Sequence, residues 1–168
     1  MDQLGTLILL MVFPGAMAGA AASDLLTMRV PNVLVIVLAV AFILAAPLAG
    51  LGAIELGLHL GIAIAALAIG FGLFAMGWIG GGDAKLFAAS CLWLGPDVLA
   101  YVVYAALIGG VLTLALLYWR RMPLPALLTS QNWIVRLHDP QKGVPYAIAL
   151  ATSGLLVYPQ TPFMAALT

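Results

Sequence analysis

Charged residues are scarce in this sequence, and their scarcity indicates the class of protein. Only 7% of the 168 residues are Asp, Glu, Lys or Arg, whereas 65% are hydrophobic. A soluble domain has about a quarter of its residues charged and about half apolar. We therefore expect an integral membrane protein, with a single domain over residues 1–168 and no separate soluble part. The formal net charge is zero, so no broad positive field would attract nucleic acid.

Cysteine and an N-terminal basic residue are also lacking. The single Cys91 excludes an internal disulfide and a zinc site made of cysteines alone. A secretory signal peptide opens with a basic region, but this chain opens with Met1-Asp2-Gln3, and its first basic residue is Arg29. We therefore expect the first apolar stretch to be retained as a membrane helix.

Long apolar stretches are abundant. A membrane-spanning helix needs about 20 mostly apolar residues, and six stretches approach this length. The fourth is short, so either its helix begins near Trp78 or Asp83 lies well below the membrane surface. The predicted fold is all-α, a polytopic membrane protein with six transmembrane helices. Their approximate bounds are Leu4–Ala22, Pro31–Ala46, Ile54–Met76, Ala84–Leu94, Pro96–Trp119 and Val144 to the C-terminus.

The basic residues predict the orientation of these helices. All six lie in or beside the first, third and fifth links between the predicted helices, and the other links and both chain ends have none. Because Lys and Arg collect on the cytoplasmic side of membrane proteins, we expect these three links in the cytoplasm and the N- and C-termini outside. The basic residues are Arg29, Lys85, Arg120, Arg121, Arg136 and Lys142.

Two features leave alternatives open. Glu55 and His59 lie four residues apart on one predicted helix face, where they would form a pair at the membrane interface or a proton relay. The longest loop, Met122–Gly143, is either a short helix lying in the interface or a simple tether. The helical interpretation of the loop rests on the spacing of Leu127, Leu128, Ile134 and Leu137.

Asp24 and Asp83 are the two acids whose apolar surroundings make an ionised side chain costly. Asp24 follows the first apolar stretch, Asp83 follows Gly80-Gly81-Gly82, and both are predicted at the cytoplasmic level. An ionised carboxylate in apolar surroundings needs partners or water. Two facing carboxylates share one proton, so that one activates a water while the other hydrogen-bonds a peptide carbonyl. The glycines let backbone approach a substrate closely, which suits hydrolysis of a peptide.

The residues alone allow other interpretations. Each acid can be a helix cap, because Asp is favoured there, and Lys85 can simply neutralise Asp83. The pair can hold a divalent cation, although this takes about six oxygen ligands and Asp139 is the only further acid on that side. Acids in a membrane also serve proton coupling in small transporters. Spacing by itself does not decide between a protease and a transporter.

Two stretches of the sequence resemble known families. Gly80-Gly81-Gly82-Asp83 is similar to the Gly-x-Gly-Asp motif of intramembrane aspartyl proteases. Asp24 with Arg29-Val30-Pro31-Asn32, together with Gly82-Asp83-Ala84-Lys85-Leu86, resembles the bacterial type IV prepilin peptidases. Leu94-Gly95 and Val144-Pro145-Tyr146 resemble family positions more weakly. The resemblance covers nearly the whole chain.

The resemblance implies an enzymatic activity and a location in the cell. It implies an aspartic endopeptidase of the bacterial inner membrane, without a metal or other cofactor, that cleaves a prepilin at the cytoplasmic face. The substrate would be a short basic leader followed by an apolar helix that enters from the lipid. The implied catalytic residues are Asp24 and Asp83, and the implied supporting residues are Gly80, Gly82, Lys85, Arg29, Pro31 and Asn32.

Long-form members of this family carry an added cytoplasmic segment with paired cysteines and also N-methylate the processed pilin. This chain has one cysteine and no such segment, so it resembles the short form associated with Flp-type (tight-adherence) pili. The resemblance therefore implies a peptidase without N-methyltransferase activity. Archaeal preflagellin peptidases are similar in size and motif, so the identity of the pilin-like substrate stays open.

Overall fold

The computed structural model describes residues 7 and 10–165, and every regular element in this part of the chain is helical, as predicted. The predicted start of the first helix at Leu4 lies outside these residues. The long helices are α2 (Val12–Thr27), α3 (Asn32–Leu48), α4 (Ala53–Ala75), α5 (Gly81–Leu94), α6 (Val98–Trp119) and α8 (Ala147–Val157). The short elements are η1 (Gly95–Asp97), η2 (Ala126–Leu128), α7 (Asn132–His138), η3 (Tyr158–Gln160) and α9 (Pro162–Ala165).

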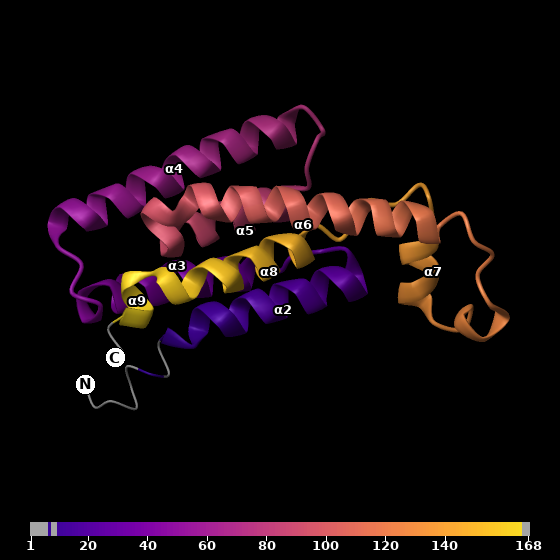
Figure 1. Ribbon diagram of the computed structural model, residues 1–168, viewed down its shortest axis with the longest axis horizontal. Coiled ribbons are helices and arrows are strands. Elements are labelled where there is room, and N and C mark those ends of the chain that lie inside the picture. Colours follow the sequence, from indigo (N-terminus) through magenta and orange to yellow (C-terminus); the bar gives the residue numbers. More distant parts are fainter. Residues whose placement is uncertain (1–6, 8–9, 166–168) are drawn as a thin grey trace.

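Successive long helices run in opposite directions, so the links between them alternate between two ends of a bundle (Figure 1). At one end, α2, α4 and α6 finish, α3, α5 and α8 begin, and α7 is attached. We call this the α7 end, and the other, where α9 lies, the α9 end (Figure 1). All six basic residues belong to segments at the α7 end. The predicted gathering of positive charge on one side is therefore present in the fold.

Two stretches are long and apolar enough to cross a membrane, and most of their residues face outward rather than into the bundle. They are α4 and the continuous stretch from α5 through η1 to α6. At about 1.5 Å per residue, the 23 residues of α4 extend about 35 Å, more than the roughly 30 Å of a bilayer core. The outward apolar surface supports a membrane protein. The other helices are shorter, so a count of six spans stays a prediction.

The fourth predicted helix begins at Gly81, so the alternative start near Trp78 is wrong. Its 14 residues extend about 21 Å and end where Gly95 adopts a φ of +53°. A Cβ at Gly95 would also collide with the ring of His59. The chain reverses at this break, so Phe87 before it stacks on Tyr101 after it, with ring centroids 5.7 Å apart.

The expected interfacial pair of Glu55 and His59 is wrong. His59 is only 2% exposed, and its Nδ1 lies 2.8 Å from the carbonyl oxygen of Leu92 in a hydrogen bond. Glu55 instead accepts the backbone N–H of Gly52 at 2.8 Å. Each of the two side chains has a different partner, so Glu55 and His59 do not pair. The proton-relay interpretation depended on the same pair. His59 joins α4 to the end of α5.

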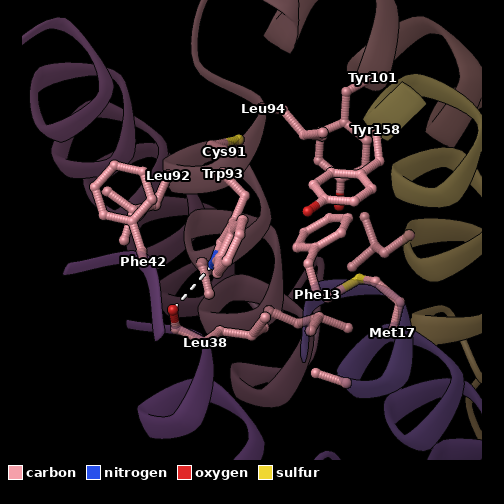
Figure 2. Packing of buried hydrophobic residues seen from close by; sticks show 14 of the residues in the cluster. Phe13, Met17, Leu38, Phe42, Cys91, Leu92, Trp93, Leu94, Tyr101 and Tyr158 are labelled. Carbon is pink, nitrogen blue, oxygen red and sulfur yellow. Dashed lines mark hydrogen bonds between the residues drawn. The ribbon is translucent and has the colours of Figure 1, made fainter. Parts of the chain in front are cut away.

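An aromatic cluster near the α9 end holds the long helices together (Figure 2). Phe13 of α2 stacks on Tyr158 with ring centroids 4.6 Å apart, and it lies 5.6 Å from Trp93 of α5. The indole Nε1 of Trp93 donates to the carbonyl oxygen of Leu38 in α3 at 2.9 Å, drawn as a dashed line in Figure 2. The cluster therefore links α2 and α5 near the α9 end, and the other ends of these helices carry Asp24 and Asp83.

The long loop is folded onto the α7 end, which favours the short-helix interpretation over a tether. The guanidinium of Arg120 donates to the carbonyl oxygens of Leu137, Lys142 and Gly143 at 2.8, 3.0 and 2.8 Å. Arg136 of α7 donates to the carbonyl oxygen of Leu26 at the end of α2, at 2.9 Å. Two arginines thus fix α7 and the start of α8 against the ends of α6 and α2.

Candidate active site

Asp24 lies near the end of α2 and is only 6% exposed. The helix ends at Met28, whose φ of +56° and N–H bond to the carbonyl oxygen of Asp24 form a left-handed cap. The Asp24 carboxylate accepts the backbone N–H of Ala147 at 3.0 Å. Ala147 is the first residue of α8, so Asp24 caps a helix far away in the sequence. The N-terminus of α8 also favours negative charge there.

Asp83 is the third residue of α5 and is partly buried. Its carboxylate accepts the backbone N–H of Gly80, the N-cap of its own helix, and lies close enough to Asp24 for the two charges to interact. A Cβ at Gly80 would lie 2.9 Å from Oδ2 of Asp83, so this position has no room for a side chain without displacing the carboxylate. The capping interpretation made Asp83 the N-cap of its helix, but that position is Gly80, and Asp24 caps α8 rather than its own helix. Capping does not account for the two acids being brought together.

The two stretches that carry the family resemblance are in direct contact. The ammonium Nζ of Lys85 in α5 donates to Oδ1 of Asn32, the first residue of α3, at 3.0 Å. A Cβ at Gly82 would lie 3.2 Å from the Cβ of Val30, so glycine allows the α2–α3 link to approach α5 closely. Lys85 therefore has Asn32 as its hydrogen-bond partner and is not simply a counter-ion of Asp83.

The remaining predicted supporting residues shape the α2–α3 link. Pro31 is the N-cap of α3, with φ of −63°, and so fixes where that helix begins. The carbonyl oxygen of Arg29 accepts the hydroxyl of Ser23 at 2.9 Å, which ties the link back to α2. The side chain of Arg29 is exposed and lines the cavities described next.

Asp24 and Asp83 line the same two cavities at the α7 end. The smaller, of about 280 Å³, lies between the two resembling stretches and includes Asn32, Gly82 and Lys85. The larger, of about 720 Å³, also has Arg29, Arg136 and Lys142 on its wall. Both cavities are open to the outside and have room for water. The arrangement supplies two carboxylates, water access and neighbouring backbone amides in one place.

Asp83 also lines two cavities that Asp24 does not reach. One, of about 700 Å³, lies beside the α4–α5 link and includes Trp78, Thr113 and Tyr146. The other, of about 230 Å³, is apolar and partly open to the outside, and its wall includes Phe87 and Ala105, further from the α7 end. Asp83 is therefore placed where polar and apolar spaces meet.

Several residues at the site were not predicted to act there. Arg136 and Lys142 were used only for orientation, yet both line the larger cavity. The amide of Ala147 reaches Asp24 across 123 positions of sequence, which no local pattern reveals. The weak family resemblance of Val144-Pro145-Tyr146 was the available signal, since Val144 and Tyr146 line the cavities that Asp83 shares.

A third acid for a cation site is not brought to the pair. Asp139 instead accepts the backbone N–H of Gln141 at 2.9 Å, within its own turn. Over residues 7 and 10–165, no three His, Cys, Asp or Glu side chains are grouped as metal ligands would be. The site described here is made of two carboxylates and their backbone donors.

The sequence model of the type IV leader peptidase family matches residues 11–116, which include both Asp24 and Asp83. No curated protein and no solved structure matches the chain. The matched region covers α2 to most of α6, and it ends before α7 and α8.

Proposed function

The chain belongs to the type IV leader peptidase family, and we propose that it is an aspartic prepilin peptidase whose catalytic pair is Asp24 and Asp83. Membership favours a leader peptidase-like protease over the small proton-coupled transporter that the sequence left open. One observation carries the choice of residues. Two acids from α2 and α5 line the same two cavities, and each accepts a backbone N–H.

The pair would hydrolyse the peptide without a covalent intermediate. The ionised carboxylate takes a proton from a water in the shared cavity, and the water oxygen attacks the scissile carbonyl carbon. The protonated carboxylate hydrogen-bonds and then protonates the carbonyl oxygen. The first carboxyl then gives the proton it took from water to the leaving nitrogen, while the second, now ionised, takes a proton from a hydroxyl of the tetrahedral intermediate, so that the C–N bond breaks and the carbonyl re-forms. Because both carboxylates serve in turn, we assign neither role to one residue alone.

The donors around the pair would position it for this chemistry. The Ala147 N–H holds Asp24, and the Gly80 N–H holds Asp83. The hydrogen bond between Lys85 and Asn32 keeps the α2–α3 link against α5, and the glycine at position 82 permits that contact. These residues are positioning residues in the proposal, and Asp24 and Asp83 are the catalytic ones.

The proposed place is the bacterial inner membrane, crossed six times, with the α7 end in the cytoplasm and both chain ends outside. The basic residues at the α7 end and the outward apolar surfaces of α4 and α6 support this orientation. Reporter fusions after Arg121 and at the C-terminus should report opposite sides of the membrane. A C-terminal fusion that reports the cytoplasm would contradict the count of spans or the orientation.

The proposed substrate is a prepilin, with its leader in the polar cavity at the α7 end and its apolar helix in the lipid. The short form similar to that of Flp-type systems suggests a Flp-type prepilin and cleavage without N-methylation. The 700 Å³ cavity beside Trp78 offers the helix a lateral approach to Asp83.

Co-expression with a Flp-type prepilin tests the proposal directly. We expect the unmodified protein to remove the leader, seen as a mobility shift on a gel, and mass spectrometry of the product to show an unmethylated N-terminus. An Asp83→Asn protein should insert equally well and leave the prepilin intact. Substantial leader removal by that variant would contradict the assignment of Asp83.

A further inference from the structure

An apolar cavity of about 230 Å³ extends from Asp83 into the bundle, and the hydrolytic chemistry itself does not use it. Its walls come from α4, α5, α6 and the start of α8. Among the described residues that line it, Asp83 alone is charged. The walls that decide its shape are Gly70, Leu73, Phe87, Ala105, Ala106 and Tyr146.

The cavity lies on the membrane side of Asp83. Phe87 is four residues further along α5, about 6 Å closer to the α9 end. Ala105 and Ala106 lie well before the end of α6 at Trp119, and so also toward the α9 end. The polar cavity with Arg29, Arg136 and Lys142 lies on the opposite side, at the α7 end. A peptide bond held at Asp83 would therefore meet different surroundings on its two sides.

The volume suits one side chain rather than a helix. An apolar cavity of about 150 Å³ is known to hold a benzene molecule, so about 230 Å³ has room for one large aliphatic or aromatic side chain. The neighbouring cavity of about 700 Å³ shares Leu73, Asp83 and Tyr146 with it, and offers space for the attached backbone.

Contacts within the protein hold the walls in place. The hydroxyl of Tyr146 donates to the carbonyl oxygen of Ala105 at 3.1 Å, and a Cβ at Gly109 would collide with the Tyr146 ring. At Gly70, a Cβ would lie 3.2 Å from the Cβ of Ala84, so α4 and α5 are closely packed there. The cavity is thus a half-open apolar space between closely packed helices, with Val102 and Ala106 exposed on its α6 side.

We propose that this cavity is a specificity pocket for the residue directly after the scissile bond, the first residue of the substrate's apolar helix. This inference rests on the proposed function. The residue next to a carbonyl held at Asp83 is the one whose side chain can reach the pocket, and the membrane side of the bond is the apolar side of the substrate. Small residues at Ala105 and Ala106 set how large that side chain can be.

Prepilins that differ only at this position, with Ala, Val, Phe or Trp, test the pocket. Ala106→Leu fills it from an exposed position on α6, where the added atoms do not need space in the core. The rate of cleavage of the Phe substrate divided by that of the Ala substrate should fall by about tenfold or more. Ala115→Leu makes the same change at an exposed position on α6 outside the pocket, and should leave this ratio unchanged.

Leu73→Ala provides the opposite test, because it enlarges the pocket. The rate ratio of the Trp substrate to the Ala substrate should rise in this variant, even if Ala106→Leu fails to fold. A ratio within one variant does not depend on how much of the protein inserts. If every pocket variant that inserts gives the same ratios of cleavage rates as the unmodified protein, the proposed role of the pocket is wrong. Failure of the unmodified protein to cleave any prepilin would instead contradict the proposed function, and the pocket with it.

Discussion

The N-termini of α4 and α5 are built alike but lie at opposite ends of the bundle (Figure 1). Each has a glycine as N-cap and an acid three residues later that accepts the glycine's backbone N–H, Gly52 with Glu55 and Gly80 with Asp83. In both, the acid satisfies an amide that the helix leaves free.

The surroundings of the two acids differ. Glu55 is exposed at the α9 end, whereas Asp83 is partly buried and interacts with a second acid, Asp24. Cavities open to the outside meet at Asp83. The same local cap is thus a stabilising feature at one end and, in our proposal, holds a catalytic group at the other. The local motif does not distinguish the two roles, and the second acid does.

The largest predicted effect is on leader removal, and it distinguishes Asp83 and its partner Asp24 from Glu55. Asp83→Asn and Asp24→Asn should each reduce leader removal by at least about a thousandfold, because groups that act as a unit are lost together. The double variant should be no worse than either single variant. Glu55→Gln, which keeps an oxygen to accept the Gly52 N–H, should cleave at the unmodified rate. These rates are measured with equal amounts of inserted protein.

Two outcomes would contradict this comparison. Equal losses in Asp83→Asn and Glu55→Gln would mean that the losses come from a general disturbance of the protein and not from a catalytic role of Asp83. Normal cleavage by all three single variants would remove the pair from catalysis and leave helix capping as the role of the two acids, because Asn caps about as well as Asp.

The next effect concerns the two glycines. Gly80 and Gly52 have φ of −72° and −73°, so alanine is not strained at either position. A Cβ would lie 2.9 Å from the Asp83 carboxylate but 3.7 Å from that of Glu55, an ordinary contact. Gly80→Ala should therefore displace the catalytic carboxylate and lower kcat by about ten- to a hundredfold. Gly52→Ala is the matched control, and equal kcat values for the two variants would show that the Gly80 contact has no role.

A smaller effect is expected for Lys85, which holds the α2–α3 link against α5 through Asn32. Lys85→Met keeps the length of the side chain and removes the hydrogen bond, so kcat should fall several-fold while the protein still inserts. Asn32→Ala should give a similar loss, and the double variant should add little to it, because both changes remove one contact. Fully additive losses would show that Lys85 acts on the site by another route.

The smallest expected effect is that of metal removal. The proposed hydrolysis uses two carboxylates and water, so purified protein treated with EDTA should keep its rate of leader removal. A loss that a divalent cation restores would instead indicate a metalloenzyme. In that case the Asp24→Asn and Asp83→Asn variants should also lose binding of that cation.

Local sequence predicted the bounds of the second, third and fifth helices to within two residues. It wrongly ended the first helix at Ala22 instead of Thr27, and wrongly continued the sixth to the C-terminus, whereas α8 ends at Val157. It was no guide to side-chain partners. The predicted end of the fifth helix at Trp119 and the break at Gly95 agree with the structure, because polar residues, glycine and proline interrupt helices locally. Spacing along one helix led to the wrong pairing of Glu55 with His59. That spacing carries no information about Leu92, which belongs to the neighbouring helix and takes the His59 hydrogen bond.

The sequence by itself determined the class of the protein, its helical content, the two acids and the glycines beside Asp83. These follow from composition, from the local conformational limits of glycine and proline, and from short motifs. Only the tertiary structure decided which groups contact each acid. Asp24 accepts an N–H from Ala147, and Arg136 anchors α7 to Leu26, across separations of 123 and 110 residues. Such contacts depend on how whole helices pack, because a side chain far along the chain comes within hydrogen-bonding distance only when the intervening helices are in place.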